Sequence, residues 1–392
     1  MPATKPPDRI LGANLLFTLD QAVAHLNHGS HGAVPTPVQR AQQRLRDEME
    51  SSPDRFFTLG LTDRLAHARN HLGAAFGIEP DGAALVPNAT TAASIVLHSL
   101  QLQAGDEIVT TNHGYGGVAI AVARACRDAG AVHRVVQLPL SPTDAAVVDA
   151  VRGALSSRTR LVIVDRITSA TARLMPAAEV AEAVRPAGVP VLVDAAHVPG
   201  NRPGEAPVGD FWVGNLHKWA FAPRGTALFA VAPAWRPRIR PLVVSWQEPV
   251  GFPWSLEWTG TDDYTSWLAA PVGLFALRSI GADTVRDHNV RLAAYGQQVL
   301  AEALGVRPAD LPAPGGELPM RLLPLPDGLV RDHDSAARLR ARLADDLSTE
   351  VAIMPFEGQG YLRISAQVYN RAPEYERLAE RLPGFLARLQ RE

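Results

Sequence analysis

The segments Val189-Pro-Val-Leu-Val-Asp194-Ala-Ala-His197 and, further on, Val213-Gly-Asn-Leu-His217-Lys218 decide how the rest of this chain is interpreted. The run 189–193 is short and continuously apolar, which is typical of a strand covered on both faces in a mostly parallel sheet. Sheets of this kind carry their ligands beyond the carboxyl ends of the strands. Asp194 stands at such an end, so the segment predicts an α/β fold with a ligand site at this aspartate.

An aspartate, a histidine and a lysine in this order are what a pyridoxal phosphate site needs. The amine of Lys218 can bond covalently to the cofactor aldehyde, and Asp194 can keep the pyridine nitrogen protonated so that the ring accepts electrons from a substrate carbanion. A His-Lys pair alone is common on protein surfaces, and Asp194 with His197 could equally be a hydrogen-bonded strand end. The combined pattern is much rarer than its parts.

Length and composition bound the class of protein. The chain has 392 residues, 46% hydrophobic and 20% charged, with a formal net charge of −2. This length predicts one large and one smaller domain. Basic residues do not outnumber acidic ones, which argues against nucleic acid as a partner. No apolar run is long enough to span a membrane and the N-terminus has no hydrophobic signal core, so we expect a cytoplasmic protein. The single cysteine, Cys126, excludes a disulfide framework, and no metal site is predicted.

The pattern of apolar residues outlines the domains. Between about residues 60 and 270 short apolar runs alternate with Ala-rich amphipathic stretches, which predicts alternating strands and helices, with strands at 83–87, 107–111, 160–165, 189–194 and 226–231. Beyond about residue 272 helix-like stretches (292–304, 335–347) join strand-like pieces (320–323, 360–365) and a loop over 308–319. We expect an N-terminal segment near the active site over 1–30, a large domain over 31–271 and a small α+β domain over 272–392.

The pair Asp194-Ala-Ala-His197 and Asn215-Leu-His217-Lys218 resembles the class V, fold-type I family of pyridoxal phosphate enzymes. In that family an Asp-x-x-His strand end precedes a Ser-x-His-Lys turn, and the resemblance extends from about Leu26 to the last helix. It implies a mostly parallel seven-stranded sheet flanked by helices in a large domain, followed by a smaller C-terminal α+β domain. It also implies that Lys218, Asp194 and His197 are the catalytic and cofactor-binding residues.

Within the family the sequence is most similar to the isopenicillin N epimerase branch, which also contains carbon–sulfur lyases acting on cysteine conjugates. The stretch Leu26-Asn-His-Gly-Ser-His-Gly-Ala-Val-Pro35 carries this similarity. It implies that Asn27, His28 and Ser30 contact the substrate, together with Arg363, which matches the family arginine that binds the substrate carboxylate. Without the family, residues 26–35 would be an ordinary glycine turn before a helix that begins near Thr36.

The resemblance also assigns the other cofactor contacts. Small polar residues after the strand at 83–87 suit a phosphate at a helix N-terminus, although a plain helix cap at Asn88 or Thr90 would use the same residues. Relatives carry a stacking aromatic side chain at the position of Tyr115, with His113 as the alternative. The predicted phosphate contacts are Ala89, Thr90, Thr91, Asn215 and His217, and Ser169 is predicted to bond the phenolic oxygen. The sequence departs from the family pattern at Asn215, Arg166 and Ala172, where relatives often have Ser, His and Gly.

The run Glu257-Trp-Thr-Gly260-Thr261 matches the family element that reaches the phosphate of the neighbouring subunit. The resemblance therefore implies a homodimer whose sites are completed across the interface by Gly260 and Thr261. Trp246, Trp254, Trp258 and Trp267 crowd the same region, where they could line a substrate pocket or form the dimer core. Arg166 could contact the substrate or could be a salt-bridged residue at a strand end.

Elimination, epimerisation and transamination of an amino acid share these residues. We predict β-elimination from an S-substituted cysteine or its sulfoxide, in secondary metabolism such as antibiotic biosynthesis or in thiol metabolism. The alternatives are epimerisation, which needs a second base such as Tyr264 or His28, and decarboxylation coupled to oxidative deamination. Cysteine desulfurases of the family use a thiol on a C-terminal loop, whereas Cys126 lies in the helix-like stretch 119–129, so persulfide chemistry is not expected. An inactive binding relative is disfavoured because Lys218 and Asp194 are present.

Overall fold

The computed structural model describes residues 5–313 and 315–391. Their contacts divide them into two compact units, a larger one made of Val34–Thr168 and Met175–Arg278 and a smaller one made of the residues up to Ala33, Ser169–Leu174 and the residues from Ser279 onward. The N-terminal residues thus belong to the same unit as the C-terminal ones. The pattern of apolar residues gave no sign of this grouping.

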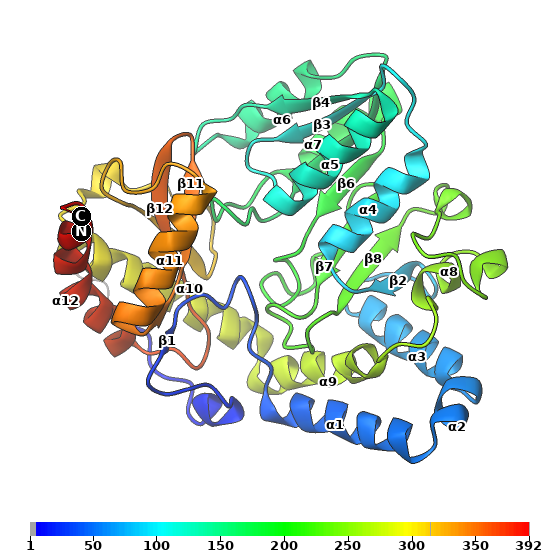
Figure 1. Cartoon of the computed structure of the whole chain (residues 1–392), viewed down its shortest axis with the longest axis horizontal. Helices are drawn as coiled ribbons and strands as arrows, with labels where there is room; N and C mark the ends of the chain where they lie inside the picture. Colours follow the sequence, from blue (N-terminus) through cyan, green and yellow to red (C-terminus); the bar gives the residue numbers. More distant parts are fainter. Residues whose placement is uncertain (1–4, 314, 392) are drawn as a thin grey trace. The chain divides into compact units, whose positions relative to one another are not determined.

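The larger unit is built on a seven-stranded sheet in the order β2-β8-β7-β6-β5-β3-β4 (Figure 1). Neighbouring strands from β4 to β7 run parallel, and β8 is antiparallel to both β7 and β2. The predicted fold class is confirmed. The bounds of the strands are β2 (Ala83–Val86), β3 (Glu107–Thr111), β4 (Val132–Val136), β5 (Thr159–Asp165), β6 (Val191–Asp194), β7 (Phe211–Asn215) and β8 (Ala227–Val231).

Helices pack against this sheet, and several of them connect its consecutive strands. The first turn of α4 is capped by Asn88, whose side chain accepts the Thr91 N–H at 2.9 Å, and this cap starts the helix directly after β2. The helices of this unit are α1 (Thr36–Ser51), α2 (Pro53–Thr58), α3 (Leu61–Ala74), α4 (Ala89–Leu100), α5 (Gly116–Ala129), α6 (Asp144–Gly153), α7 (Ala177–Val184), α8 (Trp254–Glu257) and α9 (Thr265–Ile280), with short 3-10 turns at Arg185–Ala187, Arg236–Arg238 and Glu248–Val250.

Two strands of the large sheet, β4 and β7, were not predicted from the sequence. β4 is the edge strand, and its residues are exposed or half-buried, with His133 and Arg134 in its middle. β7 is fully buried but contains Gly214, and glycine weakens a strand signal. A Cβ at Gly214 would lie 2.4 Å from the Trp212 ring, so the small residue makes room for that indole.

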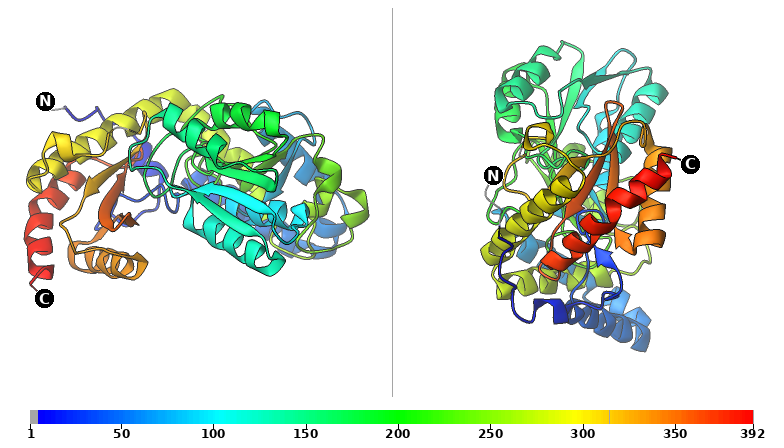
Figure 2. Two further views of the ribbon diagram at one scale, coloured as in Figure 1. Left: turned by 90° about the horizontal axis from the view of Figure 1, so that it is seen from above. Right: turned by 90° about the vertical axis from the view of Figure 1, so that its left-hand side faces the viewer.

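The smaller unit contains the antiparallel sheet β11-β12-β9 and a short parallel pair, β1 with β10. Its helix α10 lies on one side of the sheet and α11 on the other (Figure 2). Its elements are β1 (Ala24–His25), β9 (Met320–Pro324), β10 (Thr349–Glu350), β11 (Ala352–Phe356), β12 (Gln359–Ser365), α10 (Ala282–Ala303), α11 (His333–Leu347) and α12 (Ala372–Leu389), with 3-10 turns at Ala13–Leu16 and Pro308–Asp310.

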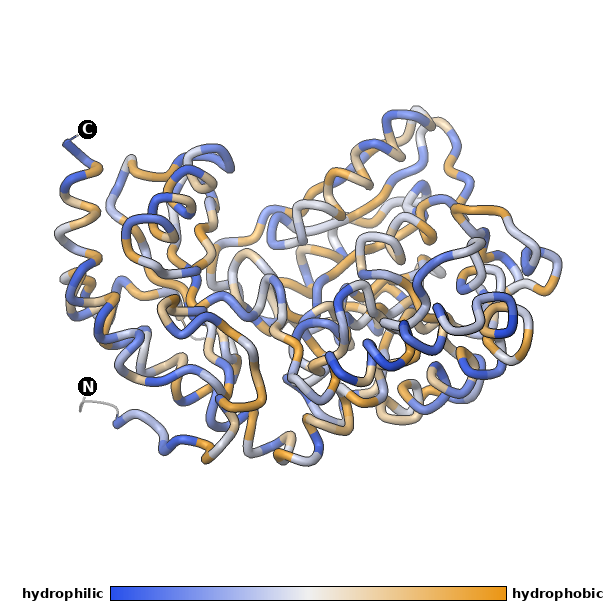
Figure 3. Tube along the Cα trace, turned by 60° about the horizontal axis from the view of Figure 1, so that its bottom comes forward, coloured by the Kyte–Doolittle hydropathy of each residue, from blue (hydrophilic) through white to orange (hydrophobic). Residues whose placement is uncertain are grey.

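The core of the smaller unit joins residues from both ends of the chain. Leu26 is fully buried with Leu362 and Phe385 in one apolar cluster. Its N–H donates to Glu350 O at 2.9 Å, and its carbonyl accepts the Ser365 N–H at 2.7 Å. Along α12, hydrophobic and hydrophilic residues alternate, so that one face of the helix enters this core (Figure 3). The segment after Leu26 is therefore held against β12.

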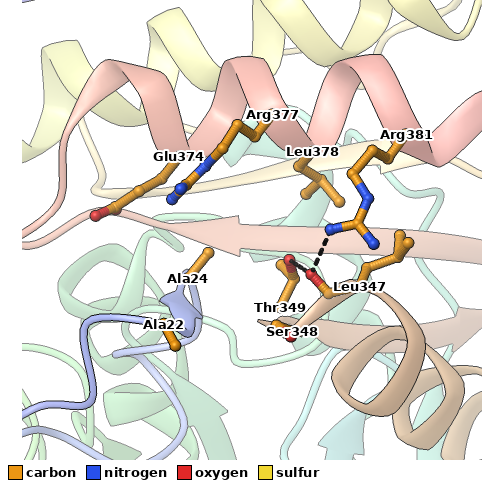
Figure 4. Close-up of a pocket in the computed structure, with 9 residues that line it drawn as sticks. All are labelled: Ala22, Ala24, Leu347, Ser348, Thr349, Glu374, Arg377, Leu378 and Arg381. Atoms are coloured by element: carbon orange, nitrogen blue, oxygen red, sulfur yellow. Dashed lines mark hydrogen bonds between the residues drawn. The ribbon is translucent and has the colours of Figure 1, made fainter.

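A cavity of about 130 Å³ opens in the smaller unit between β1, the end of α11 and α12 (Figure 4). Arg381 closes one side, where it donates to the carbonyl oxygens of Asp346 and Leu347 at the C-terminus of α11. A cation suits this helix end, so we assign Arg381 a capping role. Among the described residues no single helix is long and apolar enough to cross a membrane, and only the bent pair α9 and α10 together meets such a test of length and composition.

Candidate active site

The lysine turn follows β7 and brings Lys218 to His197. The Lys218 Nζ lies 3.1 Å from His197 Nε2, and the indole N–H of Trp219 donates to His197 Nδ1 at 3.2 Å. The imidazole is 1% exposed. Trp219 thus fixes which nitrogen of the ring faces the lysine, and the two residues predicted to act together are in direct contact.

Close backbone packing sets the position of this turn. Gly200, three residues after His197, has φ +89°, and a Cβ there would lie 2.2 Å from the carbonyl oxygen of Trp219. From the other side, a Cβ at Gly273 of α9 would lie 2.7 Å from the Ala222 N. Only glycine allows both approaches, so these two glycines hold the lysine turn between the β6 loop and α9.

Asp194 ends β6 and is buried, and its carboxylate accepts the Ala196 N–H at 3.0 Å. Burial raises the pKa of Asp194, while the Ala196 N–H and the charge of Lys218 oppose that rise. The positive charge of Lys218 therefore acts on a buried acid at the sheet edge. A cationic ring nitrogen would stabilise the same carboxylate, so this site fits the pyridinium of pyridoxal phosphate.

Four of the predicted phosphate residues, Ala89, Thr90, Thr91 and Asn215, meet at the N-terminus of α4. Asn215 accepts the Ala89 N–H at 2.9 Å and so ties the strand that leads to the lysine to this helix. Asn88 accepts the Thr91 N–H, and it also accepts the Thr91 hydroxyl at 3.2 Å. Within the described part of the chain, Thr90 is the residue of this turn whose amide and hydroxyl make no hydrogen bond. Donors at a helix N-terminus suit a phosphate, so Thr90 fits this role best.

His217 and Tyr115 are positioned by the backbone around them. The His217 Nδ1 lies 2.8 Å from the carbonyl oxygen of Thr226, which holds the ring against the chain leading into β8. Tyr115 precedes α5 and its side chain is exposed, and a Cβ at Gly117 would lie 2.8 Å from the Tyr115 ring. Gly117 thus lets the ring fold over the first turn of α5. His113, the alternative stacking residue, is fully buried with Nε2 3.0 Å from the carbonyl oxygen of Pro139.

The segment around Gly260 and Thr261 packs against aromatic side chains. The Tyr264 hydroxyl donates to the carbonyl oxygen of Gly260 at 2.5 Å, and its ring stacks on Trp258 at 5.6 Å with an interplanar angle of 9°. Thr261 is exposed. Trp267 donates to the carbonyl oxygen of Gly225 at 2.8 Å, Trp254 covers the guanidinium of buried Arg69, and Trp246 is 90% exposed. Three of the four indoles are thus packed within this unit.

Arg363 forms a second polar cluster, on β12 in the smaller unit. The guanidinium donates to the carbonyl oxygen of Ser169, to its hydroxyl at 3.2 Å, to Asn27 Oδ1 at 3.1 Å and to the Ser30 hydroxyl at 2.8 Å. It is 1% exposed, and burial lowers the pKa of Arg363 to about 10. Within the described residues no carboxylate lies within ion-pair distance and the buried Nε has no hydrogen-bond partner. A buried cation without an acid is suited to bind an anionic ligand.

This cluster groups three of the predicted residues, Asn27, Ser30 and Ser169, around Arg363. Ser169 was predicted to bond the cofactor, and its contacts in the structure are with this arginine. His28 is 2% exposed, with Nδ1 2.9 Å from the Tyr369 hydroxyl and Nε2 3.2 Å from the Gln367 amide. Both predicted roles of His28, as substrate contact and as second base, stay predictions.

Arg166 is a salt-bridged residue at the end of β5. Its guanidinium pairs with Glu205 at 2.6 and 3.2 Å and also donates to the carbonyl oxygen of Met175. Arg202 pairs with the same Glu205 at 3.1 Å. Of the two interpretations left open for Arg166, the structure favours the structural one. Among the described residues no group of three His, Cys, Asp or Glu side chains could hold a metal ion.

Asp165 is a buried acid that the sequence interpretation missed. It ends β5 directly opposite Asp194 on β6. A Cβ at Gly114 would lie 3.7 Å from Asp165 Oδ1, so the carboxyl lies beside the loop that leads to Tyr115. The available signal was an aspartate that closes an apolar run, the same signal that singled out Asp194.

The chain is similar to known enzymes over almost its full length. The family model "Aminotransferase class-V" matches residues 29–315. The isopenicillin N epimerase of Amycolatopsis lactamdurans is 33% identical, with 93% of this chain and 96% of that protein aligned. The probable chloroplastic L-cysteine desulfhydrase of Arabidopsis thaliana is 30% identical, with 94% and 84% aligned.

Solved structures share the fold. C-DES, in a lysine mutant with glycine covalently linked to the pyridoxal phosphate cofactor, superposes with a TM-score of 0.79 at 20% identity over 96% of this chain and 99% of that one. The apo cysteine desulfurase of Thermococcus onnurineus gives a TM-score of 0.72 at 17% identity, with 98% and 100% covered. The predictions of fold type, of an enzyme and of pyridoxal phosphate as its cofactor are confirmed through the family, and this chain is a member of the class V aminotransferases.

Proposed function

We propose that this enzyme is a carbon–sulfur lyase that releases a thiol, pyruvate and ammonia from an S-substituted cysteine and water. The observation that carries the proposal is the contact of Lys218 with His197 beside the buried Asp194. In this arrangement an amine, its hydrogen-bonded neighbour and a buried acid lie within one unit of the fold.

When bound, pyridoxal phosphate supplies an electron sink that stabilises negative charge at the substrate Cα. Asp194 would hold the pyridine nitrogen, Thr90 the phosphate and Tyr115 the face of the ring. Lys218 would hold the cofactor and then act as the base that takes the Cα proton, while His197 holds its Nζ in place. Departure of a thiolate from Cβ completes the elimination, and no protein thiol takes part.

The substrate carboxylate is proposed to bind Arg363. The guanidinium is held from two sides by Ser169 and by Asn27 with Ser30, which fixes its plane. A rigid planar fork matches a carboxylate through two parallel hydrogen bonds. The substrate class is therefore an amino acid with a free carboxylate.

The position of the cysteine supports elimination over desulfuration through a persulfide. Cys126, the one cysteine of the sequence, lies in α5 and is 2% exposed, and burial raises its pKa. A protonated, buried thiol is a poor nucleophile. The names of the relatives agree, because they include L-cysteine desulfhydrases, and a structural neighbour is described as the cystine C-S lyase C-DES.

Epimerisation is the second candidate, and its support is the 33% identity with an isopenicillin N epimerase. This reaction returns a proton to the opposite face of Cα and so needs a second acid. Tyr264 was one suggestion, but its hydroxyl is bonded to the carbonyl oxygen of Gly260, and burial raises its pKa. Elimination needs only Lys218 as a base, which makes it the leading proposal.

A homodimer is part of the proposal. Thr261 is exposed on one chain, as a residue offered to a partner would be. The neighbouring segment carries exposed apolar side chains at Leu242, Val243, Val244, Trp246 and Val250. Burial of such a patch against a second copy would contribute to a stable interface. The single cysteine requires no oxidising compartment, which is compatible with the proposed cytoplasmic location.

Two experiments test the function. The purified protein, loaded with pyridoxal phosphate, should absorb visible light and form pyruvate and thiol in equal amounts from S-ethyl-cysteine. Deuterium exchange with inversion at Cα, without pyruvate, would favour the epimerase instead. For the dimer, a mixture of the Lys218→Ala and Thr261→Ala chains should recover activity that neither has alone, because one of the two sites in a mixed dimer is then intact. A monomer in solution would contradict this part.

A further inference from the structure

The large sheet presents two carboxyl groups side by side at its ligand-binding edge. Asp165 and Asp194 are in-register partners on the parallel strands β5 and β6. Partners on neighbouring strands lie about 4.8 Å apart and point to the same face. Both side chains are buried, at 5% and 4% exposure. The proposed mechanism uses Asp194 alone, so a second buried acid remains unexplained.

The positive charge of Lys218 lowers the pKa of both buried acids. Arg166, next in sequence to Asp165, pairs with Glu205 instead. On the β3 side the carboxyl of Asp165 meets the backbone of Gly114 and Tyr115, with a Cβ at Gly114 calculated to lie 3.7 Å from Asp165 Oδ1.

Two buried carboxylates beside one ammonium group favour a state in which one of them keeps its proton. Burial and the neighbouring charge decide which one, because a backbone N–H opposes the rise in pKa of each acid. Asp194 accepts a hydrogen bond at 3.0 Å from Ala196 two residues on, which stabilises its anion. Burial and the neighbouring charge of Asp194 raise the pKa of Asp165 well above its usual value, and the Tyr115 N–H and Lys218 oppose this rise.

We propose that Asp165 is a positioning residue that holds a proton beside Asp194, so that the negative charge opposite the cofactor nitrogen resides on Asp194. Its second task is to accept the Tyr115 N–H, which fixes the backbone that carries the stacking ring. This inference rests on the proposed function. Its subject, however, is the chain's own acid pair, so its first test needs no cofactor.

The first test compares the thermal unfolding of the cofactor-free full chain with that of Asp165→Asn between pH 4.5 and 8. A carboxyl whose folded pKa lies above its unfolded value of about 3.9 makes the wild type lose stability as the pH rises between the two values. The asparagine variant has no such proton to lose. We expect its Tm to exceed that of the wild type by about 3 °C at pH 8, with the difference vanishing toward pH 4.5.

The opposite result would overturn the proposal. If Asp165→Asn is less stable than the wild type at pH 8 and the difference in Tm shrinks as the pH falls, then Asp165 is ionised in the folded protein. Asp149→Asn, at a carboxylate that is 65% exposed, is the control for removing a negative charge and should show neither trend.

The second test uses the holoenzyme and measures the dissociation of pyridoxal phosphate. Asp165→Ala removes the acceptor of the Tyr115 N–H, whereas Asp165→Asn keeps an oxygen there, so the Kd of the alanine variant should be about 5–10-fold higher. Equal Kd values for the two variants would refute the positioning role. A wild type that binds no cofactor would defeat the proposed function, while the unfolding test would still decide the state of Asp165.

Discussion

Replacement of Arg363 tests the proposed substrate contact most directly. The side chain is 1% exposed, four hydrogen bonds fix its plane, and no acid among the described residues neutralises it. Two parallel charge-assisted hydrogen bonds to a carboxylate are worth about 3–6 kcal/mol. Arg363→Met keeps most of the side-chain length and removes both. We therefore expect kcat/KM to fall by about 10²–10⁴-fold.

Arg363→Lys keeps the charge but loses the fork, so about one of these hydrogen bonds is lost and the fall should be about 10–100-fold. The assay is pyruvate release from S-ethyl-cysteine under kcat/KM conditions. The decarboxylated analogue, S-ethyl-cysteamine, serves as a second substrate. It has no carboxylate, so wild type and both variants should bind it equally well.

The matched control is Arg381→Met, an arginine of the same unit that donates to the carbonyl oxygens of Asp346 and Leu347. This variant should keep kcat/KM within about threefold, because capping affects stability and not the substrate. A folded Arg363→Met protein that retains wild-type kcat/KM would refute the carboxylate assignment. Equal losses with both substrates would point to a structural role for Arg363.

Three further changes probe the cofactor site. Lys218→Ala should abolish the visible absorption and lower kcat at least about 10³-fold. Lys5→Ala, at the other lysine of the chain, is the control and should leave the absorption and kcat unchanged. A Lys218→Ala protein that still absorbs would identify a different residue as the one that binds the cofactor. Gly200→Ala should weaken cofactor binding or prevent folding, because the new Cβ would clash with the Trp219 carbonyl. Gly204→Ala is the control, since this glycine also has a positive φ but open space around it, and it should change stability and cofactor binding only slightly. Thermal unfolding and cofactor titration measure both effects. Cys126→Ala should keep the rate of pyruvate formation within about threefold at a cost of about 1 kcal/mol in unfolding free energy; a stable variant without activity would argue for persulfide chemistry.

Local sequence was enough for the parts of the site that lie close together along the chain. An apolar run that ends in Asp194 gives a buried strand and its carboxyl end at once, and all five predicted strands are present within a few residues. The edge strand β4 was missed because His133 and Arg134 give it the appearance of an exposed segment. Asp165 was missed because its meaning depends on its register with Asp194, which no local pattern contains.

Long-range contacts explain the remaining differences. Asn27 and Ser30 meet Arg363 only because Leu26 bonds to both β10 and β12 in the smaller unit. The grouping of Ser169 with this arginine, and of the N-terminal residues with the C-terminal ones, likewise depends on tertiary structure.

The sequence by itself determined the family and the parallel sheet, and it predicted Lys218, Asp194 and His197 as site residues, because apolar periodicity and short motifs are local properties. Only the tertiary structure decided which groups share a charge or a hydrogen bond. Examples are Trp219 on His197, Asp165 beside Asp194, and the buried Arg363, which has no ion-pair partner among the described residues. The physical reason is that residues distant in sequence determine which polar groups are buried and which are paired. Burial and pairing in turn determine the pKa of each group and the energy of its charge.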